Sequence, residues 1–571
     1  MGRSQLLLLI LFFGALTGAV GLATKDIQNW DEGSYYSEAR FVAQAARASA
    51  MMVMGKLLPR AGYPALAELK ETSSGLPPSM GRPVNTLVNA VALLLVGEQA
   101  WVPALVAVLA GLGCIYLVFL IMRQLANETT GLLAAFLLSL SPYFLPYRRL
   151  GMCEATGAFM ATLAIWFLVR YARDPVGQLA RRHSWWLGVL CGLSFGANTR
   201  TLLLLPAVLV WRMWHVKPAE AEGASRRAGD QWWAHGLRVI AAFAAMIVLY
   251  QLPYIVAGPV AAQMGLQFQT YFEQLQRFVT AQRELGRLPL REAYGAPAYF
   301  FIYNEGPALV LLLVGLLYSL SRRGRGLLLL PSLLVLPLLQ TALLIPFARY
   351  QSWLLPVCAM LSAAGLYALS QRAGRRSAYA ATAVLVASLL IVTAYSCYRG
   401  IPVMGARSAH PAALQWCRDH GAGRVMDTNM SAAFSHPELY GLDELWQLPQ
   451  EPREAAEAIE QLGASRAGEP TGQVMVIVET QRFMAAELIM SPQQYEQSAA
   501  AMLRRYGAPL QTRDDHLRGL FPFLCFEHNR HLPDTLATLH RYESEASELS
   551  IYDGAAALRI LKKYSSSITS D

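Results

Sequence analysis

Long apolar runs recur along most of this chain, and few kinds of fold can accommodate them. Runs long enough to cross a bilayer, or nearly so, are predicted at 5–23, 102–122, 131–147, 154–171, 185–197, 201–216, 237–257, 306–320, 327–346, 351–370 and 378–398. With 54% hydrophobic and only 15% charged residues over 571 positions, most of the chain is not an ordinary soluble domain. The sequence predicts a multi-pass α-helical membrane protein with about eleven transmembrane helices.

The basic residues indicate how the predicted helices are oriented. If the N-terminus is cytoplasmic, the inside connections carry many more Lys and Arg than Asp and Glu, at Arg3, Arg123, 170–182, 212–238, 322–325 and 372–376. The positive-inside rule favours that orientation. Because the formal net charge of +9 is concentrated in these connections, it predicts a membrane protein and no nucleic-acid partner.

This topology divides the chain into two predicted domains. Residues 1–398 form a transmembrane domain with long outer loops at 24–101 and 259–305, and 399–571 form a small soluble domain outside the cytoplasm. Alternating helix and strand patterns, such as the strand candidates 424–428 and 473–480, predict an α/β fold for the second domain. A helix is expected from a Ser491 cap to Gly507. The alternative for residues 5–23 is a cleaved signal peptide, which leaves the side of everything downstream unchanged.

Charged residues gather on the outer side of the predicted bundle, where topology does not require them. Asp31 and Glu32 follow the first apolar run, and arginines stand in three short outer turns at Arg148-Arg149, Arg200 and Arg349. Guanidinium groups match phosphate oxygens in a bidentate way, and a carboxylate can accept a proton. Such a cluster suits a lipid phosphate and a reacting hydroxyl. The alternative is that each arginine snorkels to the interface or caps a helix end.

Several ordered strings resemble the C-type (GT-C) glycosyltransferases that use polyprenyl-phosphate sugars, a group that includes protein O-mannosyltransferases and aminoarabinose transferases. WDEGSYYSEA resembles their D-E-x-x-Y entry loop, and Arg82-Pro83 stands where Lys-Pro is frequent. SPYFLPYRRLGMCEATGAF, GLSFGANTRTLLLLPA and FARYQSWLLPVCAML resemble three further turns, in the family's order. The resemblance covers about 5–370. This chain departs in reading VNTLVNA after Arg82-Pro83, where aromatic residues are common, and in the asparagine and arginine of ANTR, where lysine is usual.

The resemblance implies transfer of one sugar from a polyprenyl-phosphate donor to an acceptor hydroxyl, with inversion at the anomeric carbon. Asp31 is the candidate base, with Glu32 and Glu154 as supporting carboxylates. The candidate substrate-binding residues are Tyr35, Arg82, Arg149, Arg200, Arg349 and Tyr350. Alternatives remain for some of them, because a carboxylate such as Glu154 in a first helical turn is favoured by the helix dipole in any protein, and interfacial tyrosines are usual membrane anchors.

The remaining polar residues indicate no further chemistry. The sequence contains no CxxC or HExxH metal motif, so no metal site is predicted and no cofactor is required, although carboxylates near phosphate can recruit a divalent metal without one. His410, His420, His436, His528 and His531 lack ligand-like spacing and are interpreted as surface or packing residues. Whether Cys417 and Cys525 form a disulfide is left open.

The leading hypothesis is therefore a glycosyltransferase of a bacterial inner (plasma) membrane, acting on its outer face, or of the luminal face of an endoplasmic reticulum. Its partners are a polyprenyl-phosphate sugar donor, membrane lipid, and a glycan, lipid or protein acceptor. A transporter or flippase for polyprenyl-linked glycans is the alternative, and it predicts ionisable residues near the middle of the helices. A scaffold that keeps the fold without the activity is a third. The identities of the sugar and the acceptor are open.

Overall fold

The chain divides into two compact units, and each is described by itself. The structure is a computed structural model that describes residues 2–22, 30–57, 82–171, 178–215, 225–263, 276, 298, 300–321, 327–335, 352–406, 408–428, 441–464, 473–479, 497–515 and 547–568. The first unit contains 1–20, 77–95 and 103–401, and the second contains 21–76, 96–102 and 402–571.

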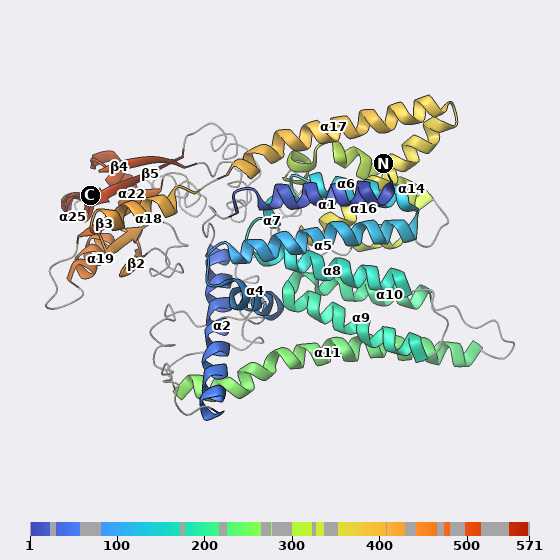
Figure 1. Ribbon diagram of the computed structural model, residues 1–571, viewed down its shortest axis with the longest axis horizontal. Helices are drawn as coiled ribbons and strands as arrows, with labels where there is room; N and C mark the ends of the chain where they lie inside the picture. The colour runs from blue at the N-terminus through green and yellow to red at the C-terminus, as the bar shows by residue number, and fades with distance from the viewer. Residues whose placement is uncertain are drawn as a thin grey trace. The chain divides into compact units, whose positions relative to one another are not determined.

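The first unit is mostly helical. Its named helices are α1 (Arg3–Ala19), α4 (Pro83–Val96), α5 (Val102–Leu125), α6 (Glu128–Leu140), α7 (Phe144–Tyr147), α8 (Cys153–Tyr171), α9 (Gln178–Ala197), the 3-10 helix η2 (Thr199–Leu203), α10 (Leu204–His215), α11 (Ser225–Gln263), α14 (Pro307–Ser321), α16 (Leu355–Gly374) and α17 (Ala378–Gly405). Helices α8, α9 and α11 lie side by side, as Figure 1 shows.

Several of these helices can cross a membrane by length and composition. Among the described residues, five are long and apolar enough, at Val102–Leu125, Cys153–Tyr171, Trp233–Leu252, Ser352–Gly374 and Ala378–Gly405. Five shorter apolar helices are Arg3–Ala19, Pro83–Val96, Glu128–Leu140, Thr199–Trp211 and Pro307–Leu320. A count of about eleven crossings stays a prediction.

Helix α4 is a feature that the apolar runs did not predict. The sequence places residues 83–96 in an outer loop, whereas the structure has a helix there with one buried face. The polar residues Asn85, Thr86 and Asn89 stand on that buried face. Residues 30–57 of the predicted outer loop 24–101 form α2 (Trp30–Leu57), which belongs to the second unit.

Small residues allow α14 and α16 to approach closely. A Cβ at Gly315 would collide with the carbonyl oxygen of Leu361, and a Cβ at Gly365 would collide with that of Leu311. Backbone contact of this kind is a common way to associate helices in lipid, where burial of apolar surface gives little drive. Larger side chains at either glycine would separate the two helices.

Contacts at both ends fix the directions of α1 and α6. Arg3 Nη1 lies 2.8 Å from Glu128 Oε2 where the two helices begin. Near their other ends, Arg148 Nη2 donates to Thr17 Oγ1 and to the carbonyl oxygen of Ser139. The two helices therefore run parallel, which agrees with a topology in which both cross from the same side.

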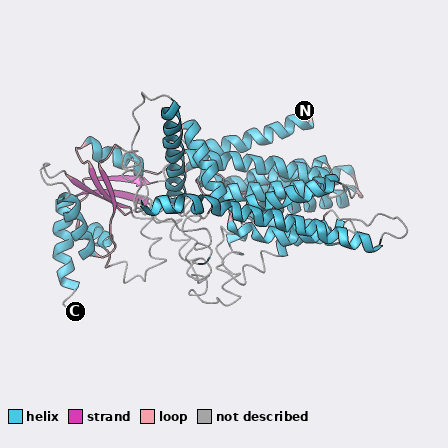
Figure 2. Ribbon diagram, turned by 90° about the horizontal axis from the view of Figure 1, so that it is seen from below, coloured by secondary structure: helices cyan, strands magenta, loops and turns pink. Residues whose placement is uncertain are grey.

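The second unit contains a five-stranded mixed sheet in the order β2-β1-β3-β5-β4. Strands β2, β1 and β3 are parallel, and β5 is antiparallel to both β3 and β4. Figure 2 shows the strands in magenta with helices beside them. The elements are β1 (Arg424–Asp427), β2 (Glu444–Gln447), β3 (Val474–Glu479), β4 (Gln511–Asp515), β5 (Ser547–Asp553), α2, α18 (His410–Asp419), α19 (Pro452–Ala464), α22 (Ala499–Tyr506) and α25 (Gly554–Ile568).

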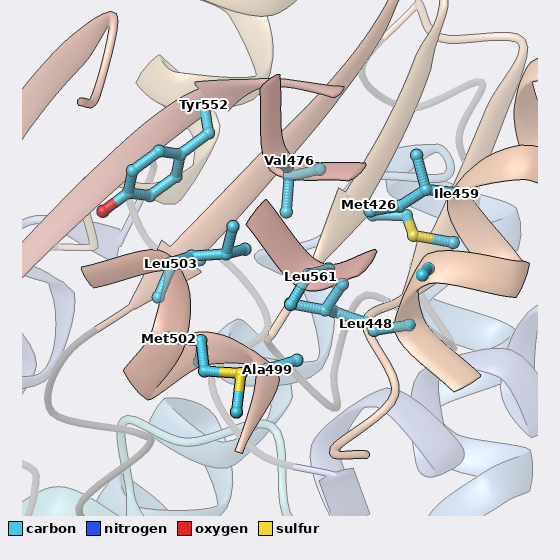
Figure 3. Close-up of a cluster of buried hydrophobic side chains, with 14 of the residues drawn as sticks. Met426, Leu448, Ile459, Val476, Ala499, Met502, Leu503, Tyr552 and Leu561 are labelled. Atoms are coloured by element: carbon cyan, nitrogen blue, oxygen red, sulfur yellow. The ribbon is translucent and has the colours of Figure 1, made fainter. Parts of the chain in front are cut away.

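Side chains that alternate along the strands pack into two hydrophobic cores. Val474, Val476 and Val478 join residues of α19, α22 and α25 on one face, part of which Figure 3 shows. Met475 and Ile477 join α18 in the other core. Both faces of the sheet are thus covered, which explains the continuous apolar run of β3.

The sequence predicts parts of this unit well and one boundary poorly. Strands β1 and β3 lie within the predicted segments 424–428 and 473–480. The predicted cap at Ser491 is wrong for α22, because that helix begins at Ala499 and its cap is Ser498, whose Oγ accepts the Ala501 N–H at 3.2 Å. Two serines seven residues apart offered the same capping chemistry. Residues 491–496 lie outside the described residues.

Candidate functional site

Arg82 stands immediately before α4 and contacts the beginning of α8. Its Nε donates a hydrogen bond to Sγ of Cys153 at 3.4 Å, across 71 positions of sequence. Pro83 opens the helix, a position where its fixed backbone angle and missing N–H carry no cost. The α4 helix therefore begins where Arg82 reaches the first turn of α8.

Glu154 follows Cys153 in the first turn of α8 and is buried, with 3% of its surface exposed. A carboxylate at a helix N-terminus is stabilised by the unpaired N–H groups and the dipole there. The Cys153 thiol lies 3.8 Å from Glu154 Oε2. One sulfur atom thus contacts both Arg82 and Glu154, which brings a cation and an anion into the same region.

Arg200 stands at the junction of α9 and η2, which approaches the next turn of α8. Asn198 caps η2, with its side-chain oxygen accepting the Arg200 N–H at 3.1 Å. A Cβ at Gly157 of α8 would lie 2.5 Å from the Cβ of Asn198, so only glycine lets the junction come so close. Arg200 itself is 3% exposed. A connected path of contacts therefore links Arg82, Glu154 and Arg200 at one end of α8 and α9.

Arg148 and Arg149 are held against the C-terminal end of α1. Arg149 donates from Nη1 to the carbonyl oxygen of Thr17 and from Nη2 to that of Val20, each at 2.7 Å. These are carbonyl groups that the end of a helix leaves without backbone partners. Arg149 thus caps α1, and its predicted role in substrate binding stays a prediction. Burial lowers the pKa of Arg148 to about 9, which leaves it charged at neutral pH.

The part of the chain that contains Arg82, Glu154 and Arg200 is similar to known proteins. Residues 78–222, which include Arg82, Glu154 and Arg200, match the model of the family described as dolichyl-phosphate-mannose-protein mannosyltransferase. YkcB of Bacillus subtilis (strain 168), whose name records a proposed mannosyltransferase, is 27% identical over 132 residues. That match covers 23% of this chain and 18% of YkcB, so it spans less than a fifth of that protein's length.

Two solved structures share the fold across most of the chain. ArnT from Cupriavidus metallidurans bound to undecaprenyl phosphate aligns with a TM-score of 0.53 and 14% identity, over 86% of this chain and 96% of that one. The Archaeoglobus fulgidus oligosaccharyltransferase aligns with a TM-score of 0.52 and 13% identity, over 90% and 79%. The resemblance to the GT-C glycosyltransferases is confirmed.

The GT-C entry-loop residues of this chain stand on α2. Asp31 lies in the first turn of that helix, and its side chain lies outside the described part of the structure. Glu32 is buried, with 2% of its surface exposed, and Tyr35 is half-buried. Arg349 and Tyr350 lie outside the described residues. The expected meeting of Asp31 with Arg200 and Arg349 therefore stays a prediction.

A carboxylate beyond the GT-C strings anchors α2 within the second unit. Glu98 accepts hydrogen bonds from Arg40 Nε and Arg47 Nη1, each at 2.5 Å, and from Gln44 at 3.1 Å. Burial alone would raise the pKa of Glu98, but the hydrogen bond and charge of Arg40, with Gln44 and Arg47, hold that pKa below its usual value. This ion-pair network fixes the part of α2 one to four turns after Glu32 and Tyr35.

Sequence reasoning did not select Glu305, which holds the turn that carries Arg148 and Arg149. Its carboxylate accepts the Ser141 hydroxyl and, at 3.3 Å, the Tyr143 N–H. Glu305 also lines a cavity of about 20 Å³, enough for one water molecule, with Ser141, Cys358 and other residues. The only signal in the sequence was an isolated carboxylate immediately before an apolar run, which is not specific.

The described residues contain no group of three or more His, Cys, Asp or Glu side chains that could hold a metal ion. Metal dependence is left open by this observation, because the loops that carry other carboxylates are not described. The arrangement of Arg82, Glu154 and Arg200 can act on an anionic group in another way. Two guanidinium groups stabilise phosphate negative charge directly.

Proposed function

We propose that this protein is an integral-membrane glycosyltransferase that moves a single sugar from a polyprenyl-phosphate donor to an acceptor hydroxyl, with inversion. The observation that carries the proposal is the path of contacts that joins Arg82, Glu154 and Arg200 at one end of α8 and α9. Support comes from the GT-C fold, which this chain shares with an ArnT whose structure holds undecaprenyl phosphate.

The reaction needs two kinds of charge. The acceptor oxygen attacks the anomeric carbon, the bond from that carbon to the phosphate oxygen breaks, and the acceptor proton passes to a base. Polyprenyl phosphate leaves as an anion, so positive charge beside it stabilises the transition state and no strong general acid is required. We assign the base to Asp31 and the phosphate contacts to Arg82, Arg200 and Arg349.

The supporting residues have less direct roles in this proposal. Glu154, buried beside Cys153, holds the cationic groups in position or orients the acceptor. Glu32 fixes the first turns of α2 and so the direction of Asp31. Tyr35 and Tyr350 donate hydrogen bonds to phosphate or sugar oxygens. Arg149, which caps α1, contributes positive potential to the same outer side of the bundle.

The proposed location follows from the distribution of Lys and Arg. We place the protein in the inner or plasma membrane, with the N-terminus in the cytoplasm and residues 399–571 outside it. The donor is then a membrane lipid that the protein meets within the bilayer, and the acceptor is a glycan, a lipid or a protein. The sugar remains to be identified.

A transporter of polyprenyl-linked glycans is the second candidate. Such a protein is expected to have ionisable residues near the middle of its helices. In the described part of the first unit, the buried Arg and Glu side chains are Arg148, Arg149, Glu154 and Arg200, and all stand in turns or at helix ends. This placement favours chemistry at the membrane surface over passage through the bundle.

The experiment uses the full chain in vesicles that contain lipid-linked sugars extracted from host membranes. Mass analysis before and after incubation should show loss of sugar from the lipid fraction and gain in an acceptor fraction. Asp31→Asn should abolish transfer, while Asp419→Asn, the same substitution at an exposed carboxylate, should leave it unchanged. Transfer by Asp31→Asn at the wild-type rate would exclude Asp31 as the base. Movement of intact lipid-linked sugar between leaflets, without transfer, would favour the transporter.

A further inference from the structure

The buried face of α4 is polar along the two turns that follow Arg82. Asn85 is 0% exposed and Asn89 is 1% exposed. Because side chains three or four residues apart share a helix face, Arg82, Asn85 and Asn89 point toward the same side of α4. Arg82 contacts Cys153, so this is the side that faces the region of Glu154 and Arg200.

The Asn85 side chain has hydrogen-bonding groups without partners in the described part of the chain. Neither its Nδ2 nor its Oδ1 has a hydrogen-bond partner there. Asn89 donates from Nδ2 to the carbonyl oxygen of Asn85 at 3.0 Å, but its Oδ1 has no partner among the described residues. Buried amides are nearly always hydrogen-bonded in folded proteins, since leaving one without a partner destabilises the fold. These groups can therefore bond a ligand.

A third side chain of the same kind stands on α8. Cys153 contacts Arg82, and Met160 packs in a cluster with Val84, Ala197 and Tyr250. Thr156 stands between Cys153 and Met160 on the same side of α8. It is 2% exposed, and its Oγ1 has no hydrogen-bond partner among the described residues. Uncharged donors and acceptors thus stand on both helices that Arg82 joins.

We propose that Asn85, Asn89 and Thr156 form a subsite for the hydroxyl groups of the sugar on the lipid-linked donor, next to the phosphate that Arg82 contacts. This inference rests on the proposed function. An amide offers two donors and two acceptors, which suits adjacent sugar hydroxyls that both donate and accept. A phosphate would instead require positive charge, and a polyprenyl chain would require an apolar surface.

The test compares a lipid phosphate with and without a sugar. The full chain in nanodiscs is titrated with undecaprenyl phosphate, mannosyl-phosphoryl-undecaprenol and glucosyl-phosphoryl-undecaprenol, and each Kd is measured. The wild type should bind at least one glycosylated lipid about tenfold more tightly than the bare lipid phosphate, as expected for a site that hydrogen-bonds a hydroxyl. Asn85→Leu should remove that preference and leave the Kd for undecaprenyl phosphate within about twofold.

Stability provides an independent readout. Leucine is close to asparagine in size and removes two unpartnered polar atoms, so Asn85→Leu should raise the melting temperature of the protein without ligand. Thr156→Val should weaken the preference without lowering the melting temperature. Asn304→Leu is the matched control, since Asn304 is also buried, at 1% exposed, and its Oδ1 also lacks a partner among the described residues, but it stands on another helix, where its Nδ2 donates to the Phe300 carbonyl. That variant should retain the preference.

The other outcomes would overturn either the sugar subsite or the proposed function. If Asn85→Leu and Thr156→Val keep the preference of the wild type, or if Asn85→Leu only lowers the melting temperature, the polar face is structural and the proposal is overturned. Where Asn85→Leu fails to fold, Thr156→Val alone decides. A wild type that binds undecaprenyl phosphate but prefers neither glycosylated form also overturns the subsite while the phosphate site stands. A wild type that binds none of the three lipids contradicts the proposed function itself.

Discussion

Arg82 donates from Nε to Sγ of Cys153 at 3.4 Å, and this bond joins the beginning of α4 to the beginning of α8. The donor in this bond is Nε, the guanidinium nitrogen nearest the backbone. A thiol is a weak acceptor, so the contact orients Arg82 without neutralising its charge. The positive group is thus fixed in direction beside the buried Glu154.

Arg82→Gln should weaken binding of undecaprenyl phosphate by about ten- to a hundredfold, because a hydrogen bond to a charged group contributes about 1.5–3 kcal/mol. Arg82→Lys should give an intermediate affinity, since it keeps the charge and loses the fork. Titration of the lipid phosphate into nanodisc-embedded protein measures these changes. Arg453→Gln, the same substitution at an exposed arginine of α19, is the control and should leave the affinity within about twofold. An Arg82→Gln protein with wild-type affinity would remove Arg82 from the phosphate site.

Gly157→Ala should destabilise the protein and impair the site together. The new Cβ would lie 2.5 Å from the Cβ of Asn198, an atom that the backbone fixes, so α8 and η2 must separate. We expect a loss of about 1–3 kcal/mol of unfolding free energy, the usual cost of overpacking. Chemical unfolding measures it. A Cβ at Gly236 of α11 would lie 3.9 Å from Leu209 Cδ2, which is an ordinary contact. Gly236→Ala is therefore the control and should leave the stability unchanged or slightly higher. Equal effects of the two substitutions would contradict the close approach.

The sequence selected residues by two kinds of argument. Arg200 was chosen because charge in outer turns of a membrane protein is costly and so indicates function, whereas Arg82 and Glu154 were chosen from strings that resemble the GT-C enzymes. The same reasoning predicted long apolar helices correctly in several places, such as α5 and α8. Local patterns carry this information because both helix length and interfacial charge depend on neighbours in sequence.

Other parts could not be predicted because they depend on distant residues. The bond between Ser141 and Glu305 spans 164 positions, and nothing near either residue specifies it. Helix α4 was placed in a loop, and nothing near it in the sequence specifies the partners that bury Asn85, Thr86 and Asn89. Arg149 was selected for its charge, but its contacts with α1 depend on how α1 ends.

Arg149→Met should lower stability because three carbonyl groups at the end of α1, those of Thr17, Gly18 and Val20, lose their donor. The bonds to Thr17 and Gly18 are buried, whereas Val20 is exposed and water can reach its carbonyl group. A buried acceptor without a partner costs about 1–3 kcal/mol, so a loss of about that size in unfolding free energy is expected. Arg376→Met, at an exposed arginine after α16, is the control and should lie within about 0.5 kcal/mol of the wild type. If Arg149→Met is as stable as the control, water replaces the cap and the residue has another role.

Glu98→Gln should loosen α2 between residues 30 and 47. The variant removes the charge that pairs with Arg40 and Arg47 while keeping the shape of the side chain. Because the pKa of Glu98 is held below its ordinary value, its contribution to stability is complete above about pH 4.5 and is lost as the pH falls through the lowered pKa. Hydrogen exchange at neutral pH should therefore be faster in this segment of the variant. Glu457→Gln is the control, because it changes an exposed ion pair with Arg453 on α19. It should leave hydrogen exchange in α2 unchanged.

Glu305 should make the stability of the first unit depend on pH near neutrality. Burial raises its pKa from an ordinary 4.5 to about 7, although bonds from Ser141 and Tyr143 act in the opposite direction. The folded state then holds the proton more tightly than the unfolded state, so stability should fall as the pH rises from about 4.5 to 7 and stay level above that.

At about 1.4 kcal/mol per pH unit, the total loss of unfolding free energy over this range is on the order of 1–3 kcal/mol after allowance for partial exposure. Glu305→Gln should remove this slope in chemical unfolding measured at several pH values, and Glu460→Gln, at an exposed position, should retain it. A slope that survives Glu305→Gln would assign the pH dependence to another group.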